Sequence, residues 1–200
     1  MRRSLWGFVA AVGLALAPIP ASAHLVSTGL GPVYDGISHF ALTPEEVLPM
    51  AALALFAGLR GPAHARRVLF VVPVVWLAAC LAAVAPRAEC SPIVFGFALL
   101  ALGTLLAIDA KISPDVIAII AIMLGLALGS IYDTSSDTNA PGLLGALGAA
   151  GLVFVLLALL SSVSLPLRRP SARIAVRVAG SWTAALGLLL VGWWVHGRPR

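Results

Sequence analysis

Five side chains between residues 24 and 46 are of types that bind divalent cations. They are His24, Asp35, His39, Glu45 and Glu46. Asp35 and His39 are four residues apart and would share one face of a helix. The two glutamates stand where an apolar segment begins, and the positive end of a helix dipole favours carboxylates there. Imidazole and carboxylate ligands together suit nickel, cobalt or zinc. The alternative is that these side chains cap a turn and the start of a helix.

Residues 1–23 predict a cleaved signal peptide, which bears on the chemistry of His24. A positive start at Arg2 and Arg3 precedes an apolar stretch over residues 5–17, and residues 21–23 form a small-residue cleavage motif. Cleavage after residue 23 makes His24 the N-terminal residue, so that its amine and its ring nitrogen can both bind one metal. An uncleaved first helix is the alternative, and it would remove this chemistry.

The composition predicts that the remaining chain, residues 24–200, is one transmembrane helical domain. Hydrophobic residues make up 60% of the chain and charged residues only 10%, whereas soluble domains carry about 25% charged residues. Apolar blocks follow one another along the chain, and a helix that spans a bilayer needs about 20 mostly apolar residues. We therefore expect an all-α fold, a polytopic transmembrane bundle of about six helices in a lipid bilayer. The predicted helices cover residues 45–59, 66–84, 91–108, 114–132, 141–163 and 174–195.

The first of these helices is short for a membrane span. Pro44 and Pro49 disfavour a straight helix, because proline lacks a backbone N–H and clashes with the preceding turn. We expect residues 35–42 to extend the segment as a broken or re-entrant helix.

Basic residues predict how the bundle sits in the membrane. An exported N-terminus places the loops alternately outside and inside, and the inner loops then receive most of the basic residues, as the positive-inside rule requires. We expect a bacterial inner (cytoplasmic) membrane protein with a periplasmic or extracellular N-terminus. The net charge of +5 belongs to these loops, so no nucleic acid partner is expected. The predicted inner residues are Arg60, Arg66, Arg67, Lys111, Arg168, Arg169, Arg173 and Arg177, and the outer ones are Arg87, Arg198 and Arg200.

The other motifs indicate helix packing rather than catalysis. Gly125 and Gly129, and a glycine at every third position from 142 to 151, are typical of closely packed membrane helices. Cys80 and Cys90 can pair only if their helix ends meet, and otherwise behave as small apolar side chains. The sequence contains no nucleotide-binding loop, haem motif or nucleophile with a base, so no enzyme is expected. It leaves open whether the chain forms a homo-oligomer.

The segment before the first long apolar helix resembles a known family. Asp35-Gly36-Ile37-Ser38-His39-Phe40, followed by an apolar helix, is similar to the HupE/UreJ proteins. These are small bacterial membrane proteins associated with nickel hydrogenases and ureases. In the family a histidine is followed by Gly-x-Asp-His. Here His39 matches the first histidine, Thr43 stands at the glycine, and Glu45 and Glu46 stand at the Asp-His pair.

The resemblance implies a permease for a divalent cation, with nickel or cobalt as the transported ion and no tightly bound cofactor. Asp35, His39, Glu45 and Glu46 would then form a site at the outer end of the bundle. A second expectation is a non-transporting membrane accessory protein, which binds a metal or a partner during assembly of a metalloenzyme. Residues 91–163 contain no histidine, so the family's later histidine-rich motif has no counterpart here.

Overall fold

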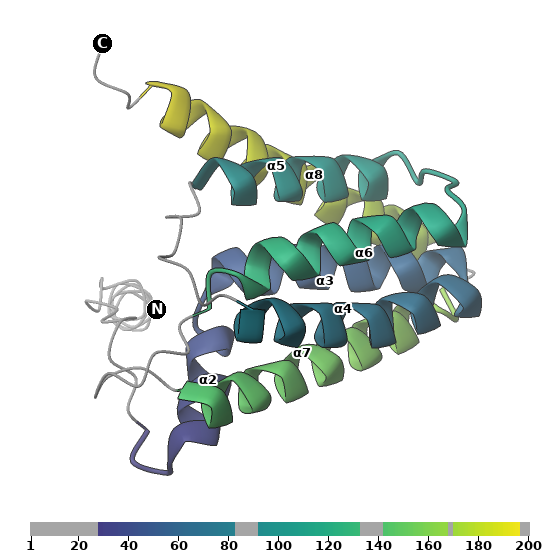
Figure 1. Cartoon of the computed structure of the whole chain (residues 1–200). Coiled ribbons are helices and arrows are strands. Elements are labelled where there is room, and N and C mark those ends of the chain that lie inside the picture. The colour runs from purple at the N-terminus through teal and green to yellow at the C-terminus, as the bar shows by residue number, and fades with distance from the viewer. Residues whose placement is uncertain (1–27, 83–91, 133–141, 168–169, 197–200) are drawn as a thin grey trace, which may run out of the picture.

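The computed structural model describes residues 28–82, 92–132, 142–167 and 170–196, which are all-helical (Figure 1). The predicted signal peptide, His24 and Cys90 lie outside these residues. The helices are α2 (Pro32–Ala41), α3 (Pro44–Arg60), α4 (Pro62–Ala82), α5 (Pro92–Ala107), α6 (Pro114–Gly129), α7 (Gly142–Ser164) and α8 (Pro170–His196). The predicted helices therefore correspond to α3–α8, with ends that differ by up to four residues.

Prolines set most of the helix starts. Six of the seven described helices begin at a proline, whose fixed φ suits the first helical turn and whose missing N–H leaves no bond unmade there. Between α3 and α4 the chain turns at Gly61 alone, with a φ of 114° that favours glycine. Ser113 caps α6, since its hydroxyl accepts a hydrogen bond of 3.3 Å from the backbone N–H of Val116.

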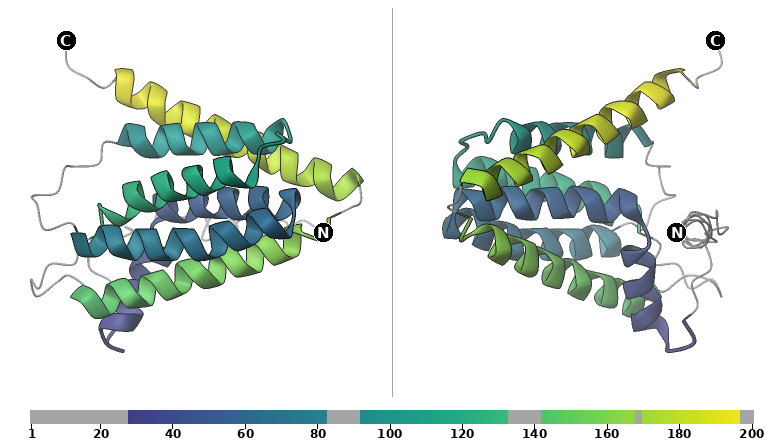
Figure 2. Two further views of the ribbon diagram at one scale, coloured as in Figure 1. Left: turned by 45° about the vertical axis from the view of Figure 1, so that its right-hand side comes forward. Right: turned by 180° about the vertical axis from the view of Figure 1, so that it is seen from behind.

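The six longer helices run back and forth, and α2 crosses one end of them (Figures 1 and 2). Helix α3 is central, because it contacts every other described helix. Helices α4, α6 and α7 pack together on one side, with α2 lying against α7. Helices α5 and α8 form a pair of their own, in which α8 buries only Gly180 and Gly187. The rest of α8 is partly or fully exposed, as a helix that faces lipid would be.

Three helices, α4, α7 and α8, are long and apolar enough to cross a membrane. The pair α2–α3 passes the same test together but is bent by 74° at its break, so it would count as a fourth span or a re-entrant loop. The sequence also predicts a broken or re-entrant helix in this segment. Helices α5 and α6 are apolar but have 16 residues each, which gives about 24 Å against a hydrocarbon thickness of about 30 Å. The described chain is thus a membrane-type helical bundle, and the number of six spans stays a prediction.

Glycines bring several helix backbones into direct contact. A Cβ added at Gly36 would lie 2.0 Å from the carbonyl oxygen of Gly145, and one at Gly129 would lie 2.2 Å from that of Trp76. Only some of the regularly spaced glycines of α7 contact another helix. Gly148 touches the backbone of Val33 in α2, whereas Gly151 has no atom within 4 Å of an added Cβ. Helix α2 is therefore held across the end of the bundle by backbone contact with α7.

Gly148→Ala should destabilise the protein, because the added Cβ would lie 2.3 Å from the carbonyl oxygen of Val33. We expect the free energy of unfolding to fall by about 1–3 kcal/mol. The matched control is Gly151→Ala on the same helix, which should leave stability unchanged or raise it by up to about 1 kcal/mol. Unfolding in detergent followed by circular dichroism measures both, and equal losses would contradict the close contact between α2 and α7.

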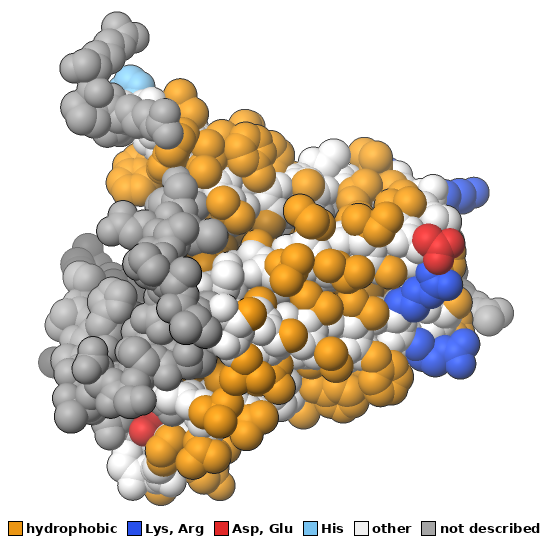
Figure 3. All heavy atoms as spheres, viewed as in Figure 1, with side chains coloured by type: hydrophobic (Ala, Val, Ile, Leu, Met, Phe, Trp, Pro, Cys, Tyr) orange, Lys and Arg blue, Asp and Glu red, His pale blue; other side chains and the backbone are white. Residues whose placement is uncertain are grey.

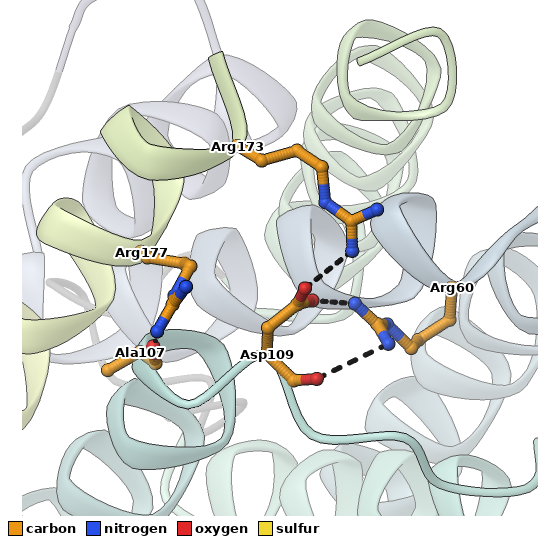
Figure 4. Close-up of polar contacts among 5 residues, drawn as sticks. All are labelled: Arg60, Ala107, Asp109, Arg173 and Arg177. Atoms are coloured by element: carbon orange, nitrogen blue, oxygen red, sulfur yellow. Dashed lines mark hydrogen bonds and ion pairs between the residues drawn. The ribbon is translucent and has the colours of Figure 1, made fainter. Parts of the chain in front are cut away.

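Basic side chains gather at the end of the bundle opposite α2 (Figure 3). We call this the basic end, formed by Arg60, Arg67 and Arg173 with their partners Asp109 and Asp115, and by Arg177. The carboxylate of Asp109 lies between the guanidinium groups of Arg60 and Arg173 and pairs with both (Figure 4). Asp109 adopts a left-handed φ of 54° in the turn after α5. These ion pairs join α3 and α8 to the α5–α6 turn at the basic end.

Asp109→Ala should be strongly destabilising, because it leaves the guanidinium of Arg60 without its carboxylate. The Arg60 side chain is only 8% exposed, and removing one partner of a buried pair costs about 3 kcal/mol or more. Asp115→Ala is the control, since Asp115 pairs with Arg67 in a position where its side chain is 82% exposed. That change should cost less than about 1 kcal/mol. Chemical denaturation of both variants measures the free energy of unfolding. Similar decreases in the two variants would show that the Asp109 ion pairs do not stabilise the fold as we describe.

Candidate functional site

The break between α2 and α3 positions the residues that the sequence singles out. Pro44 starts α3 without an N–H to continue the ladder from α2. The chain is instead held by Thr43, whose hydroxyl donates to the carbonyl oxygen of His39 over 2.7 Å. Its backbone N–H donates to the carbonyl oxygen of Phe40 over 3.1 Å. The C-terminus of α2 and the N-terminus of α3 therefore meet at one end of the bundle, with His39 before the break and the two glutamates after it.

Asp35 is half-buried and closes the loop that precedes α2. One carboxylate oxygen accepts hydrogen bonds from the backbone N–H of Thr28 at 2.6 Å and from its hydroxyl at 2.7 Å. This arrangement matches the alternative in which Asp35 caps a turn. The second carboxylate oxygen has no described protein partner, so the side chain can still offer one oxygen to a cation.

His39 is half-buried and lies on a buried aromatic cluster. Its ring meets that of Tyr132 edge-on, with 5.6 Å between the centroids. Tyr132 in turn packs against Trp76 of α4 at 4.9 Å, and Trp76 packs against Phe40 of α2 at 6.4 Å. These edge-to-face contacts join α2, α4 and the turn after α6. They fix the orientation of the histidine ring, which a metal ligand requires.

The two adjacent glutamates have opposite surroundings. Glu45 is exposed, whereas Glu46 is only 4% exposed. The Glu46 carboxyl oxygen Oε2 is buried with no hydrogen-bond partner in the described part of the chain. Burying a carboxyl group without a partner is unfavourable, and most buried polar groups in proteins are bonded. Glu46 is therefore a buried potential ligand with one carboxyl oxygen that no described protein atom bonds.

Cys80 is a further potential ligand that the sequence did not assign to this site. It is a free, buried thiol one helical turn after Trp76 on α4. The ring nitrogen of Trp76 is likewise buried without a hydrogen-bond partner among the described residues. The spacing of Trp76 and Cys80 shows that they share a face of α4. Only the fold shows that this face meets the aromatic cluster, since Trp76 packs against Phe40 and Tyr132.

The structure brings Asp35, His39, Glu45 and Glu46 to one end of the bundle but does not gather them into a preformed metal centre. In the described ranges no group of three or more His, Cys, Asp and Glu side chains is close enough to hold one ion. Asp35 lies at the start of α2, His39 lies on the aromatic cluster, and Glu46 lies in the core. Whether they bind a metal together stays a prediction, as does any part played by His24.

Hydroxyl groups along the apolar helices are bonded within their own helices. Ser161 and Ser164 of α7 are buried, and each donates to a carbonyl oxygen of the preceding turn at 2.6 and 2.9 Å. Thr104, Ser130 and Ser162 are exposed and bond in the same way. The carboxylate and imidazole groups of the described chain lie at the two ends of the bundle, and along the helices only hydroxyl oxygens are found between them.

Comparisons with protein-family models, with curated proteins and with solved structures find no match for this chain.

Replacing Glu46 with an apolar residue of similar size should stabilise the metal-free protein. Glu46→Met removes a carboxyl group that is buried without a partner, so the melting temperature should rise. Glu45→Met is the control, because Glu45 is exposed and its replacement should change stability by less than about 0.5 kcal/mol. Thermal unfolding in detergent with a chelator present measures both. A lower melting temperature for Glu46→Met would show that the carboxyl group is needed for folding.

Proposed function

We propose that this chain is an inner-membrane protein of about six spans that binds a divalent cation at the α2–α3 break and carries nickel or cobalt across the membrane. The observation that supports it best is Glu46, a carboxyl group buried at a helix break with one oxygen free of hydrogen bonds in the described chain. Ionisable residues in membrane segments are unfavourable for stability and mark functional sites. The resemblance to HupE/UreJ proteins supplies the choice of cation.

Side chains rather than helix ends supply the negative charge at the break. The last carbonyl groups of α2 lie there, but Thr43 bonds two of them, and the positive N-terminus of α3 lies beside the negative C-terminus of α2. The exposed carboxylate of Glu45 and the free oxygen of Asp35 would attract the ion first. His39, as neutral imidazole, and Glu46 would then bind it after part of its water has been lost.

The distribution of charge supports the proposed orientation. Arg60, Arg67, Arg173 and Arg177 all lie at the basic end, opposite α2 (Figure 3). Under the positive-inside rule this end faces the cytoplasm, so the α2–α3 break faces outward. A cation would then meet the predicted ligands on the outer side, and a periplasmic or extracellular N-terminus follows.

A non-transporting accessory role is the second candidate, and two observations favour it. The hydroxyl groups of the buried serines on α7 bond within that helix. In addition, the ion pairs of Asp109 with Arg60 and Arg173 join α3, α8 and the α5–α6 turn at the basic end. A protein that captures metal outside and passes it to a partner would need only the outer site.

His39→Ala and Glu46→Gln should each weaken cation binding at least about tenfold, since losing a ligand or a charge-assisted contact removes about 1.4 kcal/mol or more. Titration of the purified protein with nickel, cobalt and zinc measures binding, and uptake of the labelled ions by cells measures transport. His64→Ala is the control, because its ring contacts the carbonyl oxygen of Ile112 at the basic end.

Two results would separate the candidates. Binding together with uptake that both variants impair supports the permease, whereas binding without uptake supports the accessory role. Equal binding by wild type and both variants would reject the site at the break.

A further inference from the structure

Arg177 of α8 is a basic residue whose position the ion pairs of the basic end do not explain. Its Nε–H donates to the carbonyl oxygen of Ala107 at the end of α5 over 2.8 Å (Figure 4). This bond holds the guanidinium group in place, while the residue stays exposed. No acidic side chain of the described chain pairs with it, in contrast to Arg60, Arg67 and Arg173. No bond from its two remaining nitrogens to another described residue is seen, so they can bind an anion.

A surface groove with both polar and apolar lining lies beside this fixed charge. It has a volume of about 250 Å³ and is lined by Ala107, Ile174, Arg177, Val178 and Ser181. Ile174 and Val178 are 57% and 52% exposed, and they flank Arg177 on the surface of α8 that α5 does not cover. Only Gly180 and Gly187 of α8 are buried, so the groove is open to the surrounding membrane.

Arg177 lies near the basic end of the bundle, where the proposed orientation would place the headgroup region of the bilayer. Arg173 pairs with Asp109 in the α5–α6 turn, and Arg177 lies one helical turn further along α8, level with the last residue of α5. A cation at the membrane boundary with an apolar surface beside it complements a phospholipid, whose anionic phosphate and acyl chain are joined.

We propose that Arg177 and the groove between α5 and α8 form a binding site for one anionic phospholipid. The guanidinium group would hold the phosphate by two N–H donors, in the paired geometry that arginine offers to phosphate. The acyl chain would lie along Ile174 and Val178. Bound there, the lipid would contact both helices of a pair that joins the rest of the bundle mainly through α5 and α3.

Native mass spectrometry of the purified full chain with added phosphatidylglycerol or phosphatidylcholine tests the site. We expect wild type to retain one phosphatidylglycerol at least about tenfold more tightly than phosphatidylcholine, and Arg177→Gln to lose this preference. Arg66→Gln is the matched control, because Arg66 is exposed near the same end and its removal lowers the net charge equally. The preference should survive there.

Two further variants test the same site if Arg177→Gln folds poorly. Arg177→Lys keeps the charge but loses the bond to Ala107, so its preference should be weaker than that of wild type. Val178→Trp fills the groove and should lower retention of both lipids. Inorganic phosphate at the same concentration should not displace phosphatidylglycerol, since it has no acyl chain. Undiminished preference in Arg177→Gln, or loss of preference in Arg66→Gln to the same degree, would overturn the proposal.

Discussion

The break between α2 and α3 is the feature on which the outer end of this bundle depends. Pro44 cannot continue the hydrogen-bond ladder of α2, and the bilayer does not tolerate unbonded backbone groups. Thr43 supplies the missing hydrogen bonds. Its hydroxyl donates to the carbonyl oxygen of His39, and its backbone N–H donates to that of Phe40. The resulting 74° bend lays α2 across the ends of the longer helices. His39 is thereby placed on the aromatic cluster, and Glu46 is placed inside the core.

The carboxyl groups at the two ends of the bundle have different surroundings. At the basic end, the carboxylate of Asp109 is matched by two guanidinium groups, so its charge is compensated. At the other end, the carboxyl of Glu46 is buried with an unbonded oxygen in the described chain. The first arrangement stabilises the fold, and the second works against stability. This difference favours Glu46 over Asp109 as a group that binds a cation.

The sequence predicted the helices well, because apolar length, prolines and glycines act locally. The ranges of α3–α8 and the break before Pro44 followed from those signals. It also assigned the glycines to helix contacts, although it could not distinguish Gly148, which touches α2, from Gly151, which touches nothing. That difference depends on which face of α7 meets another helix, and an all-apolar helix carries no pattern that reveals its faces.

The candidate site was predicted only in part for the same reason. Residue types identified Asp35, His39 and the glutamates, yet neighbouring positions on a helix differ by about 100° in direction, so adjacent glutamates need not share an environment. Only the fold shows that Glu45 is exposed and Glu46 buried. Tyr132 is far from these residues in sequence, and its ring contact with His39 depends on how the end of α6 packs against α2.

X-ray absorption spectroscopy of the nickel-loaded protein tests the central claim most directly, because it reports the ligands around the metal. Our account predicts nitrogen and oxygen ligands with the scattering of an imidazole ring, and it predicts that the imidazole signal disappears in His39→Ala. An unchanged spectrum in that variant, or a spectrum without any imidazole in the wild type, would contradict a cation site at the α2–α3 break.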